Sequence, residues 1–110
     1  MNHVPDATLD AIDEFGEGLL VGTPPPITER LRSDLRLVVR RAGDGTARCR
    51  FEMEHTQRPP TLREQGSFVT TVVDGIDSSF RAWGIEPPDA YRYTETVDGS
   101  HHYEGRLSLP

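Results

Sequence analysis

Two apolar alternations on either side of a glycine-rich turn constrain this chain more than any other feature. Leu35, Leu37 and Val39 precede Gly43-Asp44-Gly45, and the apolar set Ala47, Cys49, Phe51 and Met53 follows it. A three-residue loop with Gly45 in the left-handed region pairs Leu37 with Phe51, and every apolar side chain then faces one side. A two-residue loop would place Leu37 opposite Glu52, so the three-residue loop and a hairpin are predicted.

A second hairpin is predicted after Pro87-Pro88, around Val97-Asp98-Gly99. A three-residue turn there pairs Tyr93 with Tyr103, Arg92 with Glu104 and Glu95 with His101. Cross-strand aromatic and opposite-charge pairs of this kind stabilise a hairpin.

Two amphipathic helices are expected, one before each hairpin. Residues 6–20 place Leu9, Ile12, Phe15 and Leu19 near one stripe, and Asp6 is the expected cap. Residues 67–83 place Val69, Val73, Ile76, Phe80 and Trp83 at helical spacing, with Ser67 as N-cap and Gly84 as the C′ residue. Residues 27–41 alone are ambiguous, because some of their apolar residues have helical spacing and others alternate as in a strand, and the segment that follows decides for the hairpin.

The predicted fold is therefore α+β: two helices packed on one face of a four-stranded antiparallel sheet made of two hairpins, in the order αββαββ. The 110 residues suit a single domain over residues 1–110. No apolar run reaches 18 residues and no secretory leader is evident, so a cytoplasmic protein is expected.

The charges favour a protein partner. The net charge is −6, which argues against nucleic acid, although all twelve basic residues are arginines and nine of them lie in residues 27–63. GC-rich coding, as in many bacteria, also accounts for the missing lysine. An acidic chain of this kind is expected to cover a basic surface of another protein.

The residues that could carry chemistry are few. The single cysteine, Cys49, falls on the apolar face and is read as a small buried hydrophobe. His55, His101 and His102 with Glu54 or Glu95 could in principle bind metal, but adjacent strand residues point to opposite faces, so no metal and no cofactor is expected. The aromatic residues Trp83, Tyr91, Tyr93 and Tyr103 are expected to serve mainly the core.

One family resemblance covers residues 68–109. Phe80-Arg81-Ala82-Trp83-Gly84 is followed by Glu86-Pro87-Pro88, an aromatic strand, Asp98-Gly99 and His102-Tyr103. This arrangement resembles the C-terminal half of the YezG-like family of bacterial toxin-immunity proteins. Asp89-Ala90-Tyr91 stands where that family usually has tryptophan. The resemblance implies a non-enzymatic α+β protein that neutralises a partner toxin, here a basic toxin domain.

The leading hypothesis is thus a small acidic protein-binding module. Its partner-binding positions are expected on the outward face of the second hairpin, at Arg92, Thr94, His102 and Glu104. The alternative is a small-ligand or enzymatic domain with a pocket near Trp83, Glu95 and His101. A homodimer formed through the edges of two sheets is a third expectation.

Overall fold

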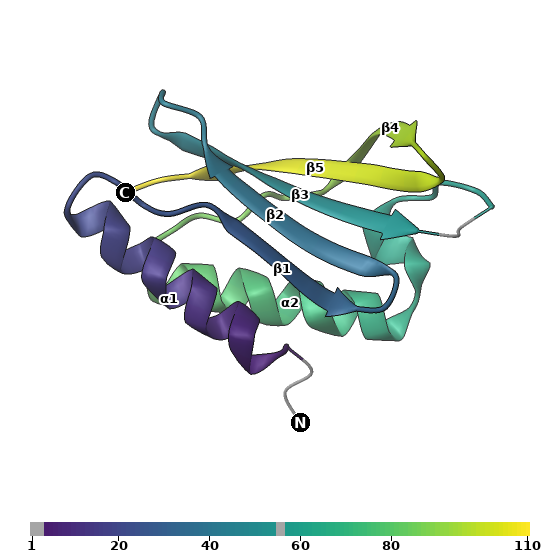
Figure 1. Cartoon of the computed structure of the whole chain (residues 1–110), viewed down its shortest axis with the longest axis horizontal. Helices are drawn as coiled ribbons and strands as arrows, with labels where there is room; N and C mark the ends of the chain where they lie inside the picture. The colour runs from purple at the N-terminus through teal and green to yellow at the C-terminus, as the bar shows by residue number, and fades with distance from the viewer. Residues whose placement is uncertain (1–3, 55–56) are drawn as a thin grey trace.

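The computed structural model of the chain describes residues 4–54 and 57–110 and is an α+β domain with two layers (Figure 1). Two helices form one layer and a five-stranded antiparallel sheet forms the other. The elements are α1 (Asp6–Leu20), β1 (Ile27–Arg32), β2 (Leu35–Arg41), β3 (Thr46–Glu54), the short 3-10 helix η1 (Leu62–Gln65), α2 (Ser67–Ala82), β4 (Arg92–Val97) and β5 (Ser100–Ser108).

The first hairpin has the predicted register. Leu37 lies opposite Phe51 and Val39 opposite Cys49, and all four side chains are buried. Gly45 has a φ of 82°, so the three-residue loop is confirmed. Because both strands keep one apolar face, the sheet can bury that face beneath the two helices.

The expected four strands are wrong by one, because residues 27–32 form an additional edge strand. β1 pairs antiparallel with β2, and the strand order is β1-β2-β3-β5-β4. β1 buries only Ile27 and Leu31, with a register shift between Arg30 and Arg32. Glu29, at an inward position opposite Leu37, breaks the apolar alternation that would have marked the strand.

The second hairpin keeps part of its predicted register and changes its turn. Tyr93 lies opposite Tyr103, as predicted, but Val97 lies opposite Ser100. Asp98 and Gly99 both have positive φ, 51° and 79°, which is the geometry of a two-residue type I′ turn. A bulge between Tyr93 and Glu95 absorbs the resulting one-residue shift.

Both helices have the predicted extent, but their first turns differ from expectation. Pro5 and Gly66 occupy the N-cap positions, and no side chain caps either helix. The end of α2 is as predicted: Gly84 has a φ of 73°, and the N–H of Ile85 donates to the carbonyl of Phe80 at 3.0 Å. This Schellman arrangement turns the chain back toward the sheet.

The two helices are in contact at Gly16 of α1, where the absence of a side chain leaves room for Trp83 at the end of α2. A Cβ on Gly16 would lie 2.2 Å from Cδ2 of Trp83, so only glycine lets the indole ring lie against α1. The Nε1–H of the same indole donates to Asp13 at 3.0 Å. Gly16, which weakens α1 as a helix, therefore joins the two helices of the layer.

Candidate functional site

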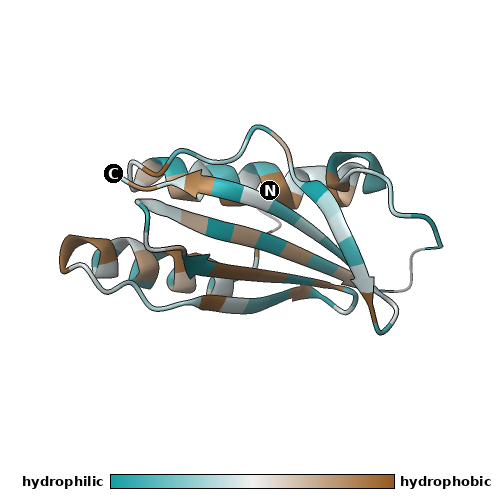
Figure 2. Cartoon of the chain, turned by 90° about the horizontal axis from the view of Figure 1, so that it is seen from above, coloured by the Kyte–Doolittle hydropathy of each residue, from teal (hydrophilic) through white to brown (hydrophobic). Residues whose placement is uncertain are grey.

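The outer face of the sheet, the face turned away from α1 and α2, carries no helix or loop over it in Figure 1. Figure 2 looks down on the sheet and shows polar and apolar residues alternating along its strands. The apolar ones, such as Phe51 and Tyr103, are buried on the helix side. The polar ones therefore point outward.

The four predicted binding positions lie together on this outer face. Arg92 of β4 is opposite Glu104 of β5, and the hydroxyl of Thr94, at the bulge, donates to the carbonyl of His102 at 3.1 Å. Nδ1 of His102 is shielded from solvent and has no hydrogen-bond partner among residues 4–54 and 57–110. These four positions therefore lie side by side, although nothing in their geometry makes them a complete site.

Two shallow hollows lie on the outer face. The first, of about 580 Å³, is lined by Arg48, Ala90, Arg92, Thr94, Glu104, Gly105 and Arg106. The second, of about 460 Å³, is lined by Thr28, Arg36, Val38, Arg40, Arg48, Arg50 and Glu52. Arg48 lines both hollows and is therefore the central residue of this surface.

Arginines outnumber acids on the outer face. They stand at positions 30, 36, 40, 48, 50, 92 and 106 of the strands, against glutamates 52, 54, 95 and 104. Arg36 lies 3.9 Å from Glu52, and Arg48 lies 3.7 Å from Glu104. In both pairs the arginine is exposed, the glutamate is only about a quarter exposed and the distance is long, so neither pair contributes much to stability. The outer face thus keeps a positive surplus on a protein whose net charge is −6.

The acids gather on the opposite layer. All five acidic side chains of α1 are exposed, at positions 6, 10, 13, 14 and 17, and no base lies on that helix. The domain is therefore electrically divided, with an acidic helical layer and a basic outer sheet face. The net charge alone conceals this division.

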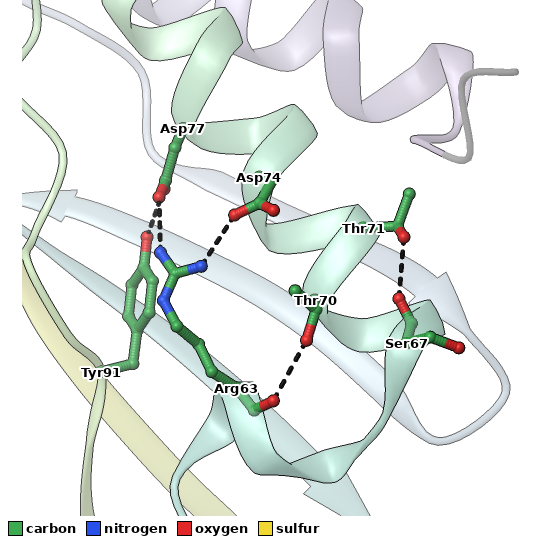
Figure 3. A network of polar contacts seen from close by, with 7 residues as sticks. All are labelled: Arg63, Ser67, Thr70, Thr71, Asp74, Asp77 and Tyr91. Carbon is green, nitrogen blue, oxygen red and sulfur yellow. Dashed lines mark hydrogen bonds and ion pairs between the residues drawn. The ribbon is translucent and has the colours of Figure 1, made fainter.

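A buried polar network ties α2 to the segment that precedes β4 (Figure 3). The hydroxyl of Tyr91 donates to Oδ1 of Asp77 at 2.9 Å, and Arg63 donates to Oδ2 at 3.0 Å. Arg63 also donates to Asp74 at 2.7 Å. The thiol of Cys49 lies 3.8 Å from the Tyr91 oxygen. Asp77 and Tyr91 are 3% and 2% exposed, so these contacts fix the fold and offer no open site.

Cys49 is predicted to be almost unreactive in the folded protein. Burial raises the pKa of its thiol from 9.0 to about 12. The thiolate is the reactive form, so at pH 8 ionisation alone should slow alkylation about a thousandfold relative to the unfolded chain. Labelling with iodoacetamide, with and without urea, measures this ratio. Rapid labelling without urea would show that β3 opens or that the thiol is accessible.

Asp77 should make stability depend on pH in an identifiable way. Burial raises the pKa of Asp77 above its ordinary value of 3.8, so as pH falls the folded protein takes up a proton before the unfolded chain does. At neutral pH the buried, ionised carboxylate lowers the free energy of unfolding by its full amount. This destabilisation decreases as pH falls from the raised pKa of the folded protein toward 3.8, the pKa of the unfolded chain. Wild type should therefore gain stability relative to Asp77→Asn as pH is lowered. Urea unfolding of both proteins between pH 7 and 4 checks this, and the opposite slope would contradict it.

Trp83, Glu95 and His101, the residues named for the alternative pocket, do not lie together. Glu95 lies on the outer face opposite His102, whereas His101 is buried on the inner side opposite Thr96. Glu86, three residues after Trp83, pairs with Ser108 at the C-terminal end of β5. Trp83 therefore lies near that end of the strand, and His101 lies near the other. Seven strand residues, about 23 Å, separate Ser108 from His101. The predicted pairing of Glu95 with His101 is wrong, because the two-residue turn shifts the register by one and places Thr96 opposite His101.

The histidines of the described residues, His101 and His102, belong to no cluster of metal ligands. Within residues 4–54 and 57–110, no group of three His, Cys, Asp or Glu side chains could hold an ion. His55 lies outside the described residues. His101 accepts or donates a hydrogen bond at 2.7 Å with the hydroxyl of Thr96, and its ring contacts that of Tyr93 edge to face.

The sheet has two edge strands, β1 and β4. All six residues of β4 are exposed, so this edge is open to pairing with another strand. Self-association remains a prediction, which size-exclusion chromatography with light scattering decides.

None of the helices in the described part of the chain is long and apolar enough to cross a membrane. Comparison with known proteins gives no relative from which a function can be transferred. No family model, no curated protein and no solved structure matches the chain.

Proposed function

We propose that the chain is a non-enzymatic protein-binding module that holds an acidic patch of another protein on the outer face of its sheet. The observation that carries this proposal is the positive surplus of arginines on a face that no other element covers. Complementary charge steers association and fixes the orientation of a partner. Arginine is also enriched in the residues that dominate binding energies at protein interfaces.

The predicted positions Arg92, Thr94, His102 and Glu104 form the β4 side of this surface. Arg92 has no ion-pair partner in the part of the chain that the structure describes, so its charge is available to a partner. Glu104, whose side chain is 26% exposed, adds a carboxylate that a partner must match. The proposed surface therefore selects by hydrogen bonding as well as by charge.

The resemblance of residues 68–109 to the YezG-like toxin-immunity proteins supports a toxin as the partner, and neutralisation of that toxin as the role. The net charge favours a basic toxin domain, whereas the outer face favours an acidic one. A basic partner would instead bind the exposed acids of α1. The two versions use opposite faces of the domain, so one experiment separates them.

The experiment places a photo-reactive benzoylphenylalanine at Thr94, on the outer face, or at Glu14, on α1, in the cells that produce the protein. We expect a covalent adduct with one acidic partner from position 94, and its loss when Arg92→Glu is added. An adduct from position 14 alone would overturn the outer face as the binding surface and would support the basic partner. The absence of adducts from both positions would refute a protein-binding role.

A further inference from the structure

Three arginines lie side by side across three neighbouring strands of the outer face. Arg48 of β3 is opposite Arg40 of β2 on one side and opposite Arg106 of β5 on the other. Neighbouring strands are about 4.8 Å apart, so this arginine row spans about 10 Å. Like charges directly opposite each other destabilise a sheet. Folding alone therefore does not favour the arginine row.

Nearby carboxylates leave the row largely uncompensated. Arg48 has one long contact, 3.7 Å to Glu104, and its side chain is 65% exposed. Arg40 and Arg106 have no ion pair within 4 Å among the described residues. By contrast, the adjacent cross-strand row alternates in sign, with Glu104 between Arg92 and Arg50. The positive surplus of the outer face is thus concentrated in the arginine row.

The surface provides space for a ligand at the same place. The two hollows adjoin at Arg48, with Arg106 lining the first and Arg40 the second. A ligand that crosses the strands above Arg48 would enter both hollows. The arginine row is therefore accessible from solvent along its whole length.

The donors present favour carboxylates over a single phosphate. β3, which carries Arg48, is paired on both sides, so its backbone N–H groups are used in the sheet and cannot form the backbone cradle typical of phosphate sites. The guanidinium groups remain, and each binds a carboxylate through two parallel hydrogen bonds. Carboxylates on successive turns of a helix are about 5–6 Å apart, which is close to the strand spacing.

We propose that Arg40, Arg48 and Arg106 form an anion-binding row that receives carboxylates from successive turns of an acidic helix of the partner. This inference rests on the proposed function, because it names the chemistry of the partner at the same face. In the free domain, repulsion within the arginine row lowers stability, whereas in the complex the same charges bind the partner. Substituting its central residue should consequently weaken binding and stabilise the fold.

The test uses the intact chain and a fluorescent helical peptide with glutamates at positions i, i+4 and i+8. Arg48→Gln should weaken binding of this peptide about tenfold in fluorescence anisotropy, because it removes a charge-assisted bidentate contact. The same variant should raise the midpoint of thermal unfolding by about 1–5 °C. Arg58→Gln removes the same charge from an exposed loop and should change neither quantity.

Other results would overturn the assignment. Unchanged peptide affinity together with a lower unfolding midpoint would make Arg48 a structural residue. Tighter binding of tripolyphosphate, or of a double-stranded oligonucleotide, than of the peptide would assign the arginine row to another ligand. If Arg48→Gln binds the peptide normally while the adduct from position 94 persists, the row fails and the proposed function stands. Absence of the position-94 adduct when Arg48 is intact would reject the proposed function itself.

Discussion

Phe51→Ala is expected to lower the free energy of unfolding by about 3–5 kcal/mol. Phe51 is fully buried at the centre of the sheet, between Leu37 on β2 and Tyr103 on β5. Its ring also meets that of Tyr91 edge to face at 4.9 Å. Truncation removes this contact and leaves a cavity that interior strands cannot easily close. A domain of this size has a total stability of about 5–15 kcal/mol, so the variant should be close to unfolding.

Urea unfolding followed by circular dichroism measures this effect, and the neighbouring outward residue supplies the control. Glu52→Gln keeps the side-chain length and removes only a long ion pair with Arg36. It should change stability by less than about 0.5 kcal/mol. Equal effects of the two substitutions would show that the strand does not bury alternate residues, and the assignment of the outer face would fail with it.

Gly105→Val is expected to cost about 3 kcal/mol or more, at the upper end for overpacking. A Cβ at this position would lie 2.6 Å from Cγ of Pro88 and 3.0 Å from Cδ1 of Tyr91. The proline ring cannot turn away, and Tyr91 is held by its hydrogen bond to Asp77. The valine side chain must therefore lift residues 88–91 from β5 and expose Tyr91.

A rescue experiment identifies this cause. Pro88→Gly removes the nearest atoms, so the double variant Gly105→Val with Pro88→Gly should be more stable than the sum of the single effects predicts. Ser108→Val, an exposed position on the same strand, should change stability by less than about 0.5 kcal/mol. If the effects of Gly105→Val and Pro88→Gly on the free energy of unfolding simply add, the contact with Pro88 is not what excludes a side chain at position 105.

Sequence patterns predicted those parts of the fold that depend on neighbours along the chain. The alternation around Phe51 fixed the register of the first hairpin, and the apolar period from Val69 to Phe80 fixed α2. β1 was not predicted as a strand, because Glu29 occupies an inward position and only two of its residues are buried. Asp98-Gly99 was recognised as a turn, but its two-residue form moved Glu95 away from His101.

The less predictable features depend on residues that are distant in sequence. The arginines of the first hairpin were visible, but their alignment with Arg106 requires the pairing of β3 with β5. No local pattern specifies which strands become neighbours in a sheet. In the same way, the link from Tyr91 to Asp77 follows from the path of residues 85–91 over β5. The four predicted binding positions were found together because they lie on one hairpin.

The central place of β5 has a consequence during synthesis. β5 lies between β3 and β4. The backbone N–H and C=O groups of β3 that bond to β5 therefore stay unpaired until residues 100–108 have left the ribosome. Throughout that interval the nascent chain presents a long strand edge to its surroundings, which is a template for aggregation. Release of the chain before residue 100 should therefore give an insoluble product in which the first hairpin has already formed.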